Sequence, residues 1–246
     1  MPQPLAGRIA LVTGASRGIG YATALALARA GAHVVAVART VGGLEELDDA
    51  ARAAGSTATL VPLDLRDFDA LYRLAAALNE RHGRLDVLVG NAAMAATLSP
   101  LDHIDPKIWE EMMALNVTAN WHLIRAMDPL LKRSDAGRVV FVTSGIATLA
   151  HAYWAPYSVS KAALDVLART YAAETSSTPV RVNLFNPGPT RTRMRAMIMP
   201  GEDPMTLPAP EQVAEKILDL CLPGVAETGK IYDFRSGELQ DFMRPA

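Results

Sequence analysis

The fold of this chain is decided by the stretch Arg8-Ile-Ala-Leu-Val-Thr-Gly14-Ala-Ser-Arg-Gly18-Ile-Gly20. An apolar run stops there at three glycines, and an Ala- and Leu-rich segment with helical periodicity, Tyr21 to Ala30, follows at once. This order predicts a strand, a tight turn and the start of a helix. Glycine lets a ligand approach the backbone, and a helix start offers N–H groups that suit a pyrophosphate. A plain strand-to-helix turn without a ligand is the alternative.

Length, composition and charge narrow the class of protein. The chain has 246 residues, 50% hydrophobic and 20% charged, which indicates a globular protein. The net charge of −2 argues against an electrostatic nucleic-acid binder. The single cysteine, Cys221, excludes an intrachain disulfide and favours a reducing compartment. Neither an apolar run of about 18 residues nor a signal-peptide pattern is present, so we expect a cytoplasmic protein and no membrane contact.

Strand and helix patterns alternate along nearly the whole chain. This alternation predicts an α/β fold: one doubly wound parallel sheet of about seven strands with helices on both faces. Residues 1–246 should form a single domain, with a substrate lid near 190–208, where Pro, Met and Gly are frequent and periodicity is weak. We expect the longest helices near 104–131 and 155–175. Strands are expected near 8–13, 33–38, 57–62, 85–89, 137–143, 179–185 and 229–234.

The residues that carry chemistry follow the fifth expected strand. Ser144 stands at its carboxyl end, where open α/β sheets place ligands, and Tyr157 and Lys161 share one face of the next helix. A tyrosine has a pKa of about 10. An ammonium about 4 Å away, at an effective dielectric of about 20, gives roughly 4 kcal/mol and lowers that pKa by about three units. This would suit Tyr157 to acid–base catalysis, with Ser144 stabilising developing charge. A surface tyrosine and lysine on an amphipathic helix are the alternative.

Three motifs together resemble the short-chain dehydrogenase/reductase family: Thr13-Gly-x-x-x-Gly-x-Gly20, the upstream Ser144, and Tyr157-x-x-x-Lys161. The resemblance covers residues 5 to about 235 and implies a Rossmann-like fold that binds a nicotinamide cofactor. It also implies that Lys161 reaches the nicotinamide ribose and that the backbone carbonyl of Asn116 holds a water of a proton relay. For Asn116, an amide paired within its helix or with a neighbour is the alternative. The catalytic residues are therefore expected to be Asn116, Ser144, Tyr157 and Lys161.

The choice between NADP(H) and NAD(H) depends on the end of the second expected strand. An NAD enzyme usually carries an acid there, about 20 residues after the glycine turn. This chain has Arg39 instead, and Arg17 lies inside the turn. Guanidinium groups suit a phosphate, so we predict NADP(H) in preference to NAD(H). Two solvated arginines are the alternative.

Other cofactor contacts come from the resemblance. It implies that Asp64 accepts a hydrogen bond from the adenine amino group, although a turn cap is compatible with the same position. It also implies that Thr192, with Thr190 near enough to share the role, contacts the nicotinamide carboxamide; an ordinary Pro-Gly turn is the alternative. The expected cofactor-binding residues are Gly14, Ser16, Arg17, Gly18, Ile19, Gly20, Arg39, Asp64, Leu65, Asn91, Ala92, Tyr157, Lys161, Pro187, Gly188, Thr190 and Thr192.

Two segments depart from the family pattern. The usual Asn-Asn-Ala-Gly is Gly90-Asn-Ala-Ala93 here, which removes one side-chain amide. The chain ends in Asp233-Phe-Arg-Ser-Gly237-Glu238 in place of a paired glycine motif that often serves a tetramer interface. We therefore expect a homodimer built on the two long helices, with a homotetramer as the alternative.

Substrate selection should lie in three stretches, 90–100, 146–156 and 190–208. Tyr153 and Trp154 would frame an apolar pocket, and His151 is expected to be a bystander. Arg191, Arg193 and Arg195 either bind an anionic substrate or form a solvated face. No cluster has metal-ligand spacing, so we expect no metal. The methionine-rich lid is either apolar lining or core: Met194, Met197, Ile198, Met199 and Met205.

The sequence predicts an NADP(H)-dependent oxidoreductase that interconverts a ketone and a secondary alcohol by hydride transfer. A 3-oxoacyl thioester (acyl carrier protein) reductase is the first alternative. A non-catalytic NADP(H)-binding sensor or interaction protein is the second, although the complete Ser144, Tyr157 and Lys161 set weighs against it. The expected partners are a small carbonyl or alcohol substrate and a second copy of the chain.

Overall fold

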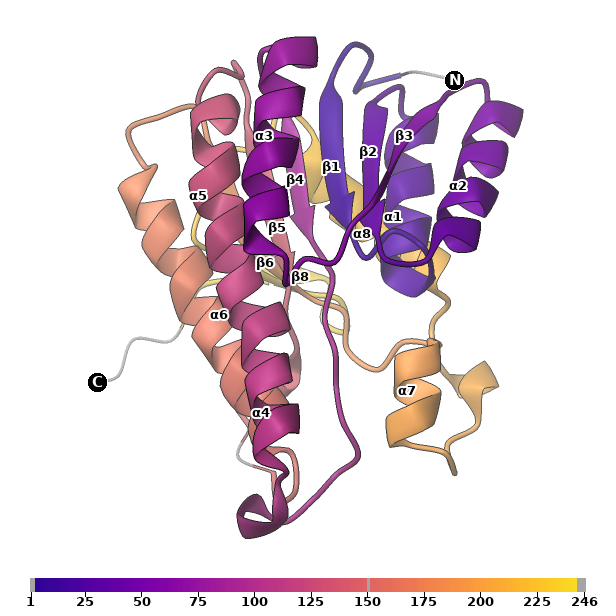
Figure 1. Cartoon of the computed structure of the whole chain (residues 1–246), viewed down its shortest axis with the longest axis vertical. Helices are drawn as coiled ribbons and strands as arrows, with labels where there is room; N and C mark the ends of the chain where they lie inside the picture. The colour runs from indigo at the N-terminus through magenta and orange to yellow at the C-terminus, as the bar shows by residue number, and fades with distance from the viewer. Residues whose placement is uncertain (1–2, 150, 243–246) are drawn as a thin grey trace.

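The computed structural model describes residues 3–149 and 151–242, which form one sheet between two layers of helices (Figure 1). The strand order is β3-β2-β1-β4-β5-β6-β7-β8, so the order reverses between β1 and β4. A ligand site is expected at such a reversal, beyond the carboxyl ends of the strands. The parallel strands are β1 (Ile9–Thr13), β2 (His33–Ala38), β3 (Ala58–Pro62), β4 (Val87–Gly90), β5 (Arg138–Val142), β6 (Arg181–Asn186) and β7 (Ile231–Asp233).

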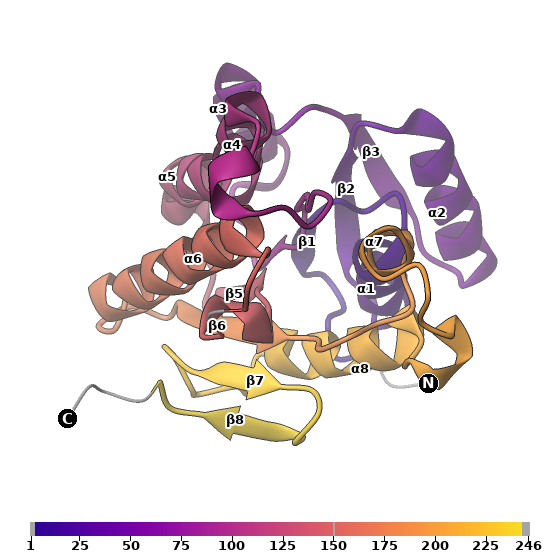
Figure 2. The same cartoon turned by 90° about the horizontal axis from the view of Figure 1, so that it is seen from below.

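An eighth strand, β8 (Glu238–Gln240), pairs antiparallel to β7 and was not predicted. Its three residues are mostly exposed and carry no apolar run, so hydrophobic patterning gives no signal for it. The Asp233 to Glu238 segment, which departs from the family pattern, forms the turn between these two strands (Figure 2).

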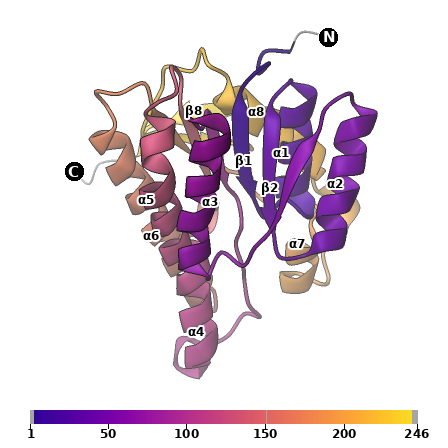
Figure 3. The same ribbon diagram turned by 45° about the horizontal axis from the view of Figure 1, so that its top comes forward.

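Helices cover both faces of the sheet, as predicted. Leu27, Leu44 and Ile217 of α1, α2 and α8 pack in one core cluster, and Leu71, Leu123 and Leu164 of α3, α5 and α6 pack in the other (Figure 3). Among the helices of the described ranges, none is long and apolar enough to cross a membrane. The helices are α1 (Gly18–Arg29), α2 (Val41–Ala53), α3 (Phe68–His82), α4 (Pro106–Met113), α5 (Ala119–Leu131), α6 (Ala155–Glu174), α7 (Arg193–Ile198) and α8 (Pro210–Cys221).

The long helix expected near 104–131 is interrupted. One π turn, Ala114–Thr118, separates α4 from α5. Single π turns inside α-helices are frequent at functional sites because they displace backbone hydrogen bonds from their usual partners. The interruption falls on Asn116.

The amino ends of the strands are held by a buried carboxylate. Asp86, just before β4, accepts hydrogen bonds from the Ile9 amide at 2.8 Å and the Ser134 hydroxyl at 2.6 Å. It also pairs with Arg8 and Arg84. These bonds outweigh the effect of burial and lower the pKa of the Asp86 carboxyl. Hydrogen bonds and ion pairs therefore hold this end of the sheet together. The candidate active site lies at the opposite end, in the loops that follow the carboxyl ends of the strands.

Candidate active site

The glycine turn after β1 has the shape of a cradle. Gly14 and Gly18 have φ of +68° and +57°, a backbone conformation that other residues rarely adopt. A Cβ on Gly20 would lie 2.3 Å from the Gly14 carbonyl oxygen. Arg17 caps α1 without any side-chain hydrogen bond, and no acid stands in the first turn. The first N–H groups of α1 are thus left for an anionic ligand, as a dinucleotide pyrophosphate requires.

Two neighbouring segments fix this turn. The Asn91 side-chain amide donates to the Thr13 carbonyl at 2.9 Å, and the backbone amides of Asn91 and Ala92 donate to the Thr13 hydroxyl at 3.0 and 3.1 Å. Helix α2 packs against Ser16, because a Cβ on Gly43 would come within 2.4 Å of the Ser16 carbonyl. Asn91 and Ala92 therefore brace the cradle from the end of β4.

The departure at Gly90 has a steric cause. A Cβ there would lie 2.3 Å from the Phe141 ring and 2.9 Å from Asn120 Oδ1. Phe141 fills the space that a side chain at position 90 would need. The amide of Asn120, for which no role was predicted, lies at the same point.

Ser144, Tyr157 and Lys161 meet at the carboxyl end of β5. Ser144 follows the strand, and Tyr157 lies in the first turn of α6, which begins with Pro156 at a favourable position. Ser144 lies near enough to the Tyr157 hydroxyl to lower its pKa. Lys161 Nζ lies 5.8 Å from the Tyr157 ring centroid and donates to the Val142 carbonyl at 2.8 Å. The predicted catalytic side chains are therefore together.

The ionisation of this group differs from the prediction. Burial raises the pKa of Tyr157 to about 12, while Ser144 acts in the opposite direction. Burial lowers the pKa of Lys161 to about 8, opposed by the charge of Asp165. The expectation that Lys161 brings the pKa of Tyr157 near neutrality was wrong for this arrangement, because burial raises that pKa and Lys161 does not offset it. Tyr157 is a protonated acid at neutral pH.

Asp165 is a buried partner that the sequence analysis missed. It lies one turn after Lys161 on α6, and its carboxylate accepts a hydrogen bond from the Thr143 hydroxyl. Burial raises its pKa to about 6, against the effects of Thr143 and of the Lys161 charge. Its spacing of four residues from Lys161 was the available signal, since such residues share a helix face. Asp165 supplies the negative charge that keeps buried Lys161 protonated.

The side-chain amide and the backbone carbonyl of Asn116 make separate hydrogen bonds. The side-chain amide exchanges two hydrogen bonds of 2.9 Å with the Met94 backbone and donates to the Ser160 hydroxyl at 3.0 Å. This is the structural pairing that stood as the alternative. The Asn116 carbonyl, inside the π turn, accepts from Asn120 Nδ2 at 2.8 Å.

The expected adenosine end lies beyond β2 and β3. The Arg39 side chain is 60% exposed, with Nη1 3.9 Å from Asp64 Oδ2. Asp64 also receives a two-pronged ion pair from Arg66, at 2.8 and 3.1 Å, which lowers the pKa of its carboxyl. It further accepts from the Arg66 backbone amide at 3.0 Å, which is the turn-cap role. The sequence analysis missed Arg66, whose position two residues after Asp64 gave no signal.

The expected nicotinamide end is shaped by the turn after β6. Gly188 has φ of +61°, and the buried Thr190 hydroxyl is directed at the carbonyls of Pro187 and Gly188, 3.3 Å from each. Thr192 caps α7, accepting from the Arg195 amide at 3.2 Å. Its methyl group would be 3.5 Å from a Cβ on Gly18. Thr192 therefore faces the glycine turn, while Thr190 is turned into its own loop.

A narrow cleft of about 10 Å³ lies in front of Tyr157 and receives residues from all three expected substrate stretches. Tyr153, 57% exposed, has φ of +73°, the one positive value at a non-glycine position in the described ranges. Such strain is typical of functional sites. Its carbonyl accepts from the Ser99 amide at 3.2 Å, which joins two of the stretches. The cleft is lined by Ala95, Ala96, Thr97, Leu98, Met112, Tyr153, Trp154, Pro156, Tyr157 and Ile198.

The arginines of the 190–208 segment do not act together. Arg195 forms a two-pronged ion pair with Glu202, at 2.5 and 2.8 Å, and Arg191 contacts the Met205 sulfur at 3.1 Å. Arg193 is exposed. Met197, Met199 and Met205 are exposed as well, so they are not core residues, and Ile198 alone of the apolar set reaches the cleft. His151 is also exposed, and the described residues contain no cluster of three metal-ligating side chains.

Known proteins share this architecture. A family model described as short chain dehydrogenase matches residues 8–203. The chain belongs to the short chain dehydrogenase family. It is 35% identical over 236 residues to the uncharacterized oxidoreductase YciK of Escherichia coli, covering 94% of this chain and 92% of that protein. It is 36% identical over 252 residues to the rhamnolipids biosynthesis 3-oxoacyl-[acyl-carrier-protein] reductase of Pseudomonas aeruginosa, covering 95% and 96%.

A solved structure agrees. The short chain dehydrogenase of Shigella flexneri complexed with NADP superposes with a TM-score of 0.89 at 35% identity, covering 95% of this chain and 99% of that one. The present chain is therefore an oxidoreductase of this family. It has the Rossmann-like fold that its glycine turn predicts. The open glycine cradle and the uncapped start of α1 fit a nicotinamide dinucleotide, the cofactor class of the family.

Proposed function

We propose that this enzyme reduces a ketone to a secondary alcohol, and catalyses the reverse oxidation, with NADP(H). The observation that carries the proposal is the meeting of Ser144, Tyr157 and buried Lys161 at the carboxyl end of β5. Two neighbouring hydroxyl groups can both donate to a single carbonyl oxygen. A protein that only binds the cofactor has no need of such a pair.

The chain's own residues divide the work of the reaction. Ser144 donates a hydrogen bond to the substrate oxygen and stabilises the charge that develops on it. Tyr157, protonated at neutral pH, gives its proton to the same oxygen. A bound nicotinamide supplies the hydride for reduction. Lys161 and the Asn116 carbonyl, with a relay water, return a proton to Tyr157. The raised pKa of Tyr157 favours the acid role, and therefore the reductive direction.

The preference for NADP(H) rests on Arg17 and Arg39. Both side chains are exposed beside the glycine cradle, and Arg39 is only loosely paired, 3.9 Å from Asp64. A 2′-phosphate between them would gain charge-assisted hydrogen bonds. The related Shigella enzyme was solved with NADP. Asp64, Leu65, Pro187, Gly188, Thr190 and Thr192 complete the proposed cofactor site.

A 3-oxoacyl thioester is the second candidate substrate, because the Pseudomonas relative is named as a reductase of that class. The cleft is lined mostly by apolar side chains, and exposed Arg193 offers a charge to an acidic carrier. Residues 190–208 would act as the substrate lid. The exposed apolar side chains of α5 and α6 (Trp121, Val159 and Val166) would form a homodimer interface.

The test is oxidation of NADPH and of NADH by the purified enzyme with simple ketones, sugars and 3-oxoacyl thioesters. We expect turnover with NADPH and a loss of about 10² to 10⁴-fold in Tyr157→Phe, with unchanged affinity for NADPH. Turnover with 3-oxoacyl thioesters alone would select the second candidate. Near-wild-type turnover by Tyr157→Phe would refute the assignment of the acid. Tight NADPH binding with no turnover across the panel would favour a sensor.

A further inference from the structure

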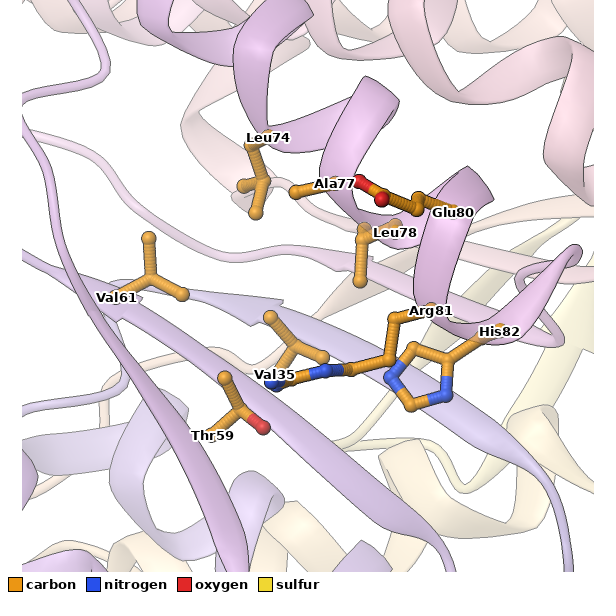
Figure 4. A pocket seen from close by; sticks show the side chains of 9 residues that line it. All are labelled: Val35, Thr59, Val61, Leu74, Ala77, Leu78, Glu80, Arg81 and His82. Carbon is orange, nitrogen blue, oxygen red and sulfur yellow. The ribbon is translucent and has the colours of Figure 1, made fainter.

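A second cavity lies far from the reacting groups, between α3 and the β3 edge of the sheet (Figure 4). Its volume is about 630 Å³, within the range of small-molecule sites. Strands β1 and β4 separate β2 and β3 from β5, which carries Ser144 at its end. No residue of the catalytic cleft lines this cavity.

The cavity is apolar at one end and basic at the other. Val61 and Leu74 lie at the apolar end, and His82 lies at the opposite end (Figure 4). The Arg81 side chain extends from the last turn of α3 towards Val35 on the floor of the cavity (Figure 4). A ligand here would need an apolar body and a polar head.

The basic end lacks an anionic partner. His33 and His82 have ring centroids 5.2 Å apart, and the charge of Arg81 contributes to the lowered pKa of both imidazoles. Within residues 3–149 and 151–242, no carboxylate lies within ion-pair distance of these three side chains. Glu80 lines the cavity, but its carboxylate is directed along α3 towards Ala77 (Figure 4).

One polar atom at this end has no hydrogen-bond partner. His82 Nε2 is buried and unpaired among the described residues, whereas His33 Nε2 is paired with the Thr59 hydroxyl at 2.8 Å. A buried unsatisfied nitrogen is costly, and few occur in a native protein. Because this nitrogen is enclosed, an anionic oxygen reaches it only when the exposed Arg81 side chain moves; the oxygen would then satisfy the nitrogen and balance the arginine charge.

We propose that this cavity is a second binding site, for a small amphipathic carboxylate such as a medium-chain fatty acid. Its tail lies along Val61 and Leu74, and its carboxylate accepts hydrogen bonds from Arg81 and His82. A single negative charge matches the one permanent cation of the site. The apolar end excludes a free inorganic anion as the preferred ligand.

The test is calorimetric titration of the full-length enzyme, saturated with NADP⁺, with decanoate and with decanol. We expect one decanoate per chain and binding of decanol that is at least about tenfold weaker, because decanol lacks the charge that Arg81 recognises. Arg81→Gln and His82→Gln should each weaken decanoate by a similar factor. Arg73→Gln is the matched control, since Arg73 lies on α3 but pairs with Asp67 outside the cavity.

Circular dichroism melting would verify that all three variants fold. The proposal is overturned if decanoate fails to bind at millimolar concentration. It is also overturned if Arg81→Gln and His82→Gln bind decanoate as the wild type does, because that binding would belong to the catalytic cleft or to the surface.

Discussion

The side-chain amide of Asn186 donates to the Asp233 carboxylate at 2.7 Å, which connects the last parallel strand to the proposed catalytic centre. The Asn186 amide oxygen accepts in turn from the backbone amides of Gly145, at 2.9 Å, and Gly188, at 3.1 Å. Gly145 follows Ser144 directly, and Gly188 belongs to the turn expected to face the nicotinamide. Asp233 therefore fixes the orientation of an amide that holds two loops of the site.

Loss of this carboxylate should damage catalysis more than folding. In Asp233→Ala, the Asn186 amide is free to rotate and the loops after β5 and β6 loosen. We expect kcat/KM to fall about tenfold, with a loss of about 1 kcal/mol in the free energy of unfolding. Asp241→Ala removes an exposed acid from the same end of the chain and serves as the control. Equal kinetics in the two variants would show that Asp233 does not position the site.

Arg39 should determine cofactor choice. In Arg39→Gln, the proposed 2′-phosphate loses a charge-assisted hydrogen bond, so the Kd of NADPH should rise about tenfold while that of NADH stays within about twofold. Fluorescence titration with each nucleotide measures both constants. Arg52→Gln, which removes an arginine paired with Asp48 on α2, is the control. If the affinities for NADH and NADPH fell by the same factor, Arg39 would support the fold and would not contact the 2′-phosphate.

The parallel sheet with helices on both faces and the meeting of Ser144, Tyr157 and Lys161 could be predicted from the sequence. Buried parallel strands are continuous apolar runs, and Tyr157 and Lys161 share a helix face by spacing alone. The short exposed β8 could not be found in this way. The π turn at Asn116 could not be found from the sequence either, because one inserted residue does not visibly change the apolar periodicity across positions 104–131.

Polar pairings were the other unpredicted features. Asn186 meets Asp233, and Asp64 meets Arg66, through polar contacts that leave no periodic pattern in the sequence. The ionisation of Tyr157 was mistaken for a different reason. Spacing shows that Lys161 is on the same face, but only coordinates show that burial of Tyr157 outweighs the charge of Lys161.

Asp86 should be the largest single electrostatic contribution to stability. Replacing it with Ala leaves Arg8 and Arg84 without this buried partner, so we expect a loss of about 3 kcal/mol in the free energy of unfolding at pH 7. The pKa of Asp86 is lowered in the folded chain, so its stabilisation is complete above the unfolded pKa of about 3.9 and is lost as pH falls through the folded value.

Urea unfolding at several pH values measures this effect. The difference between wild type and Asp86→Ala should be constant from neutral pH down to about 5 and should shrink below about 4. Asp135→Ala removes an exposed acid that also contacts Arg8 and is the matched control. A difference that persists unchanged in acid would attribute the loss to packing and not to the charge of Asp86.

Asp165 should set the alkaline limit of activity. Its negative charge raises the pKa of buried Lys161, which stands at about 8. In Asp165→Asn that charge is absent, so the pKa of Lys161 falls and the lysine loses its proton at a lower pH. If protonated Lys161 is required, the alkaline limb of kcat/KM should move down by about one pH unit.

The measurement is the pH profile of ketone reduction from pH 6 to 9, with Glu174→Gln as the control because Glu174 is an exposed acid on the same helix. A lower rate with an unmoved alkaline limb would assign Asp165 to packing against Thr143. A limb that shifts in Asp165→Asn but not in Glu174→Gln requires a charge that acts on the catalytic lysine itself, since packing defects reduce the rate at every pH alike.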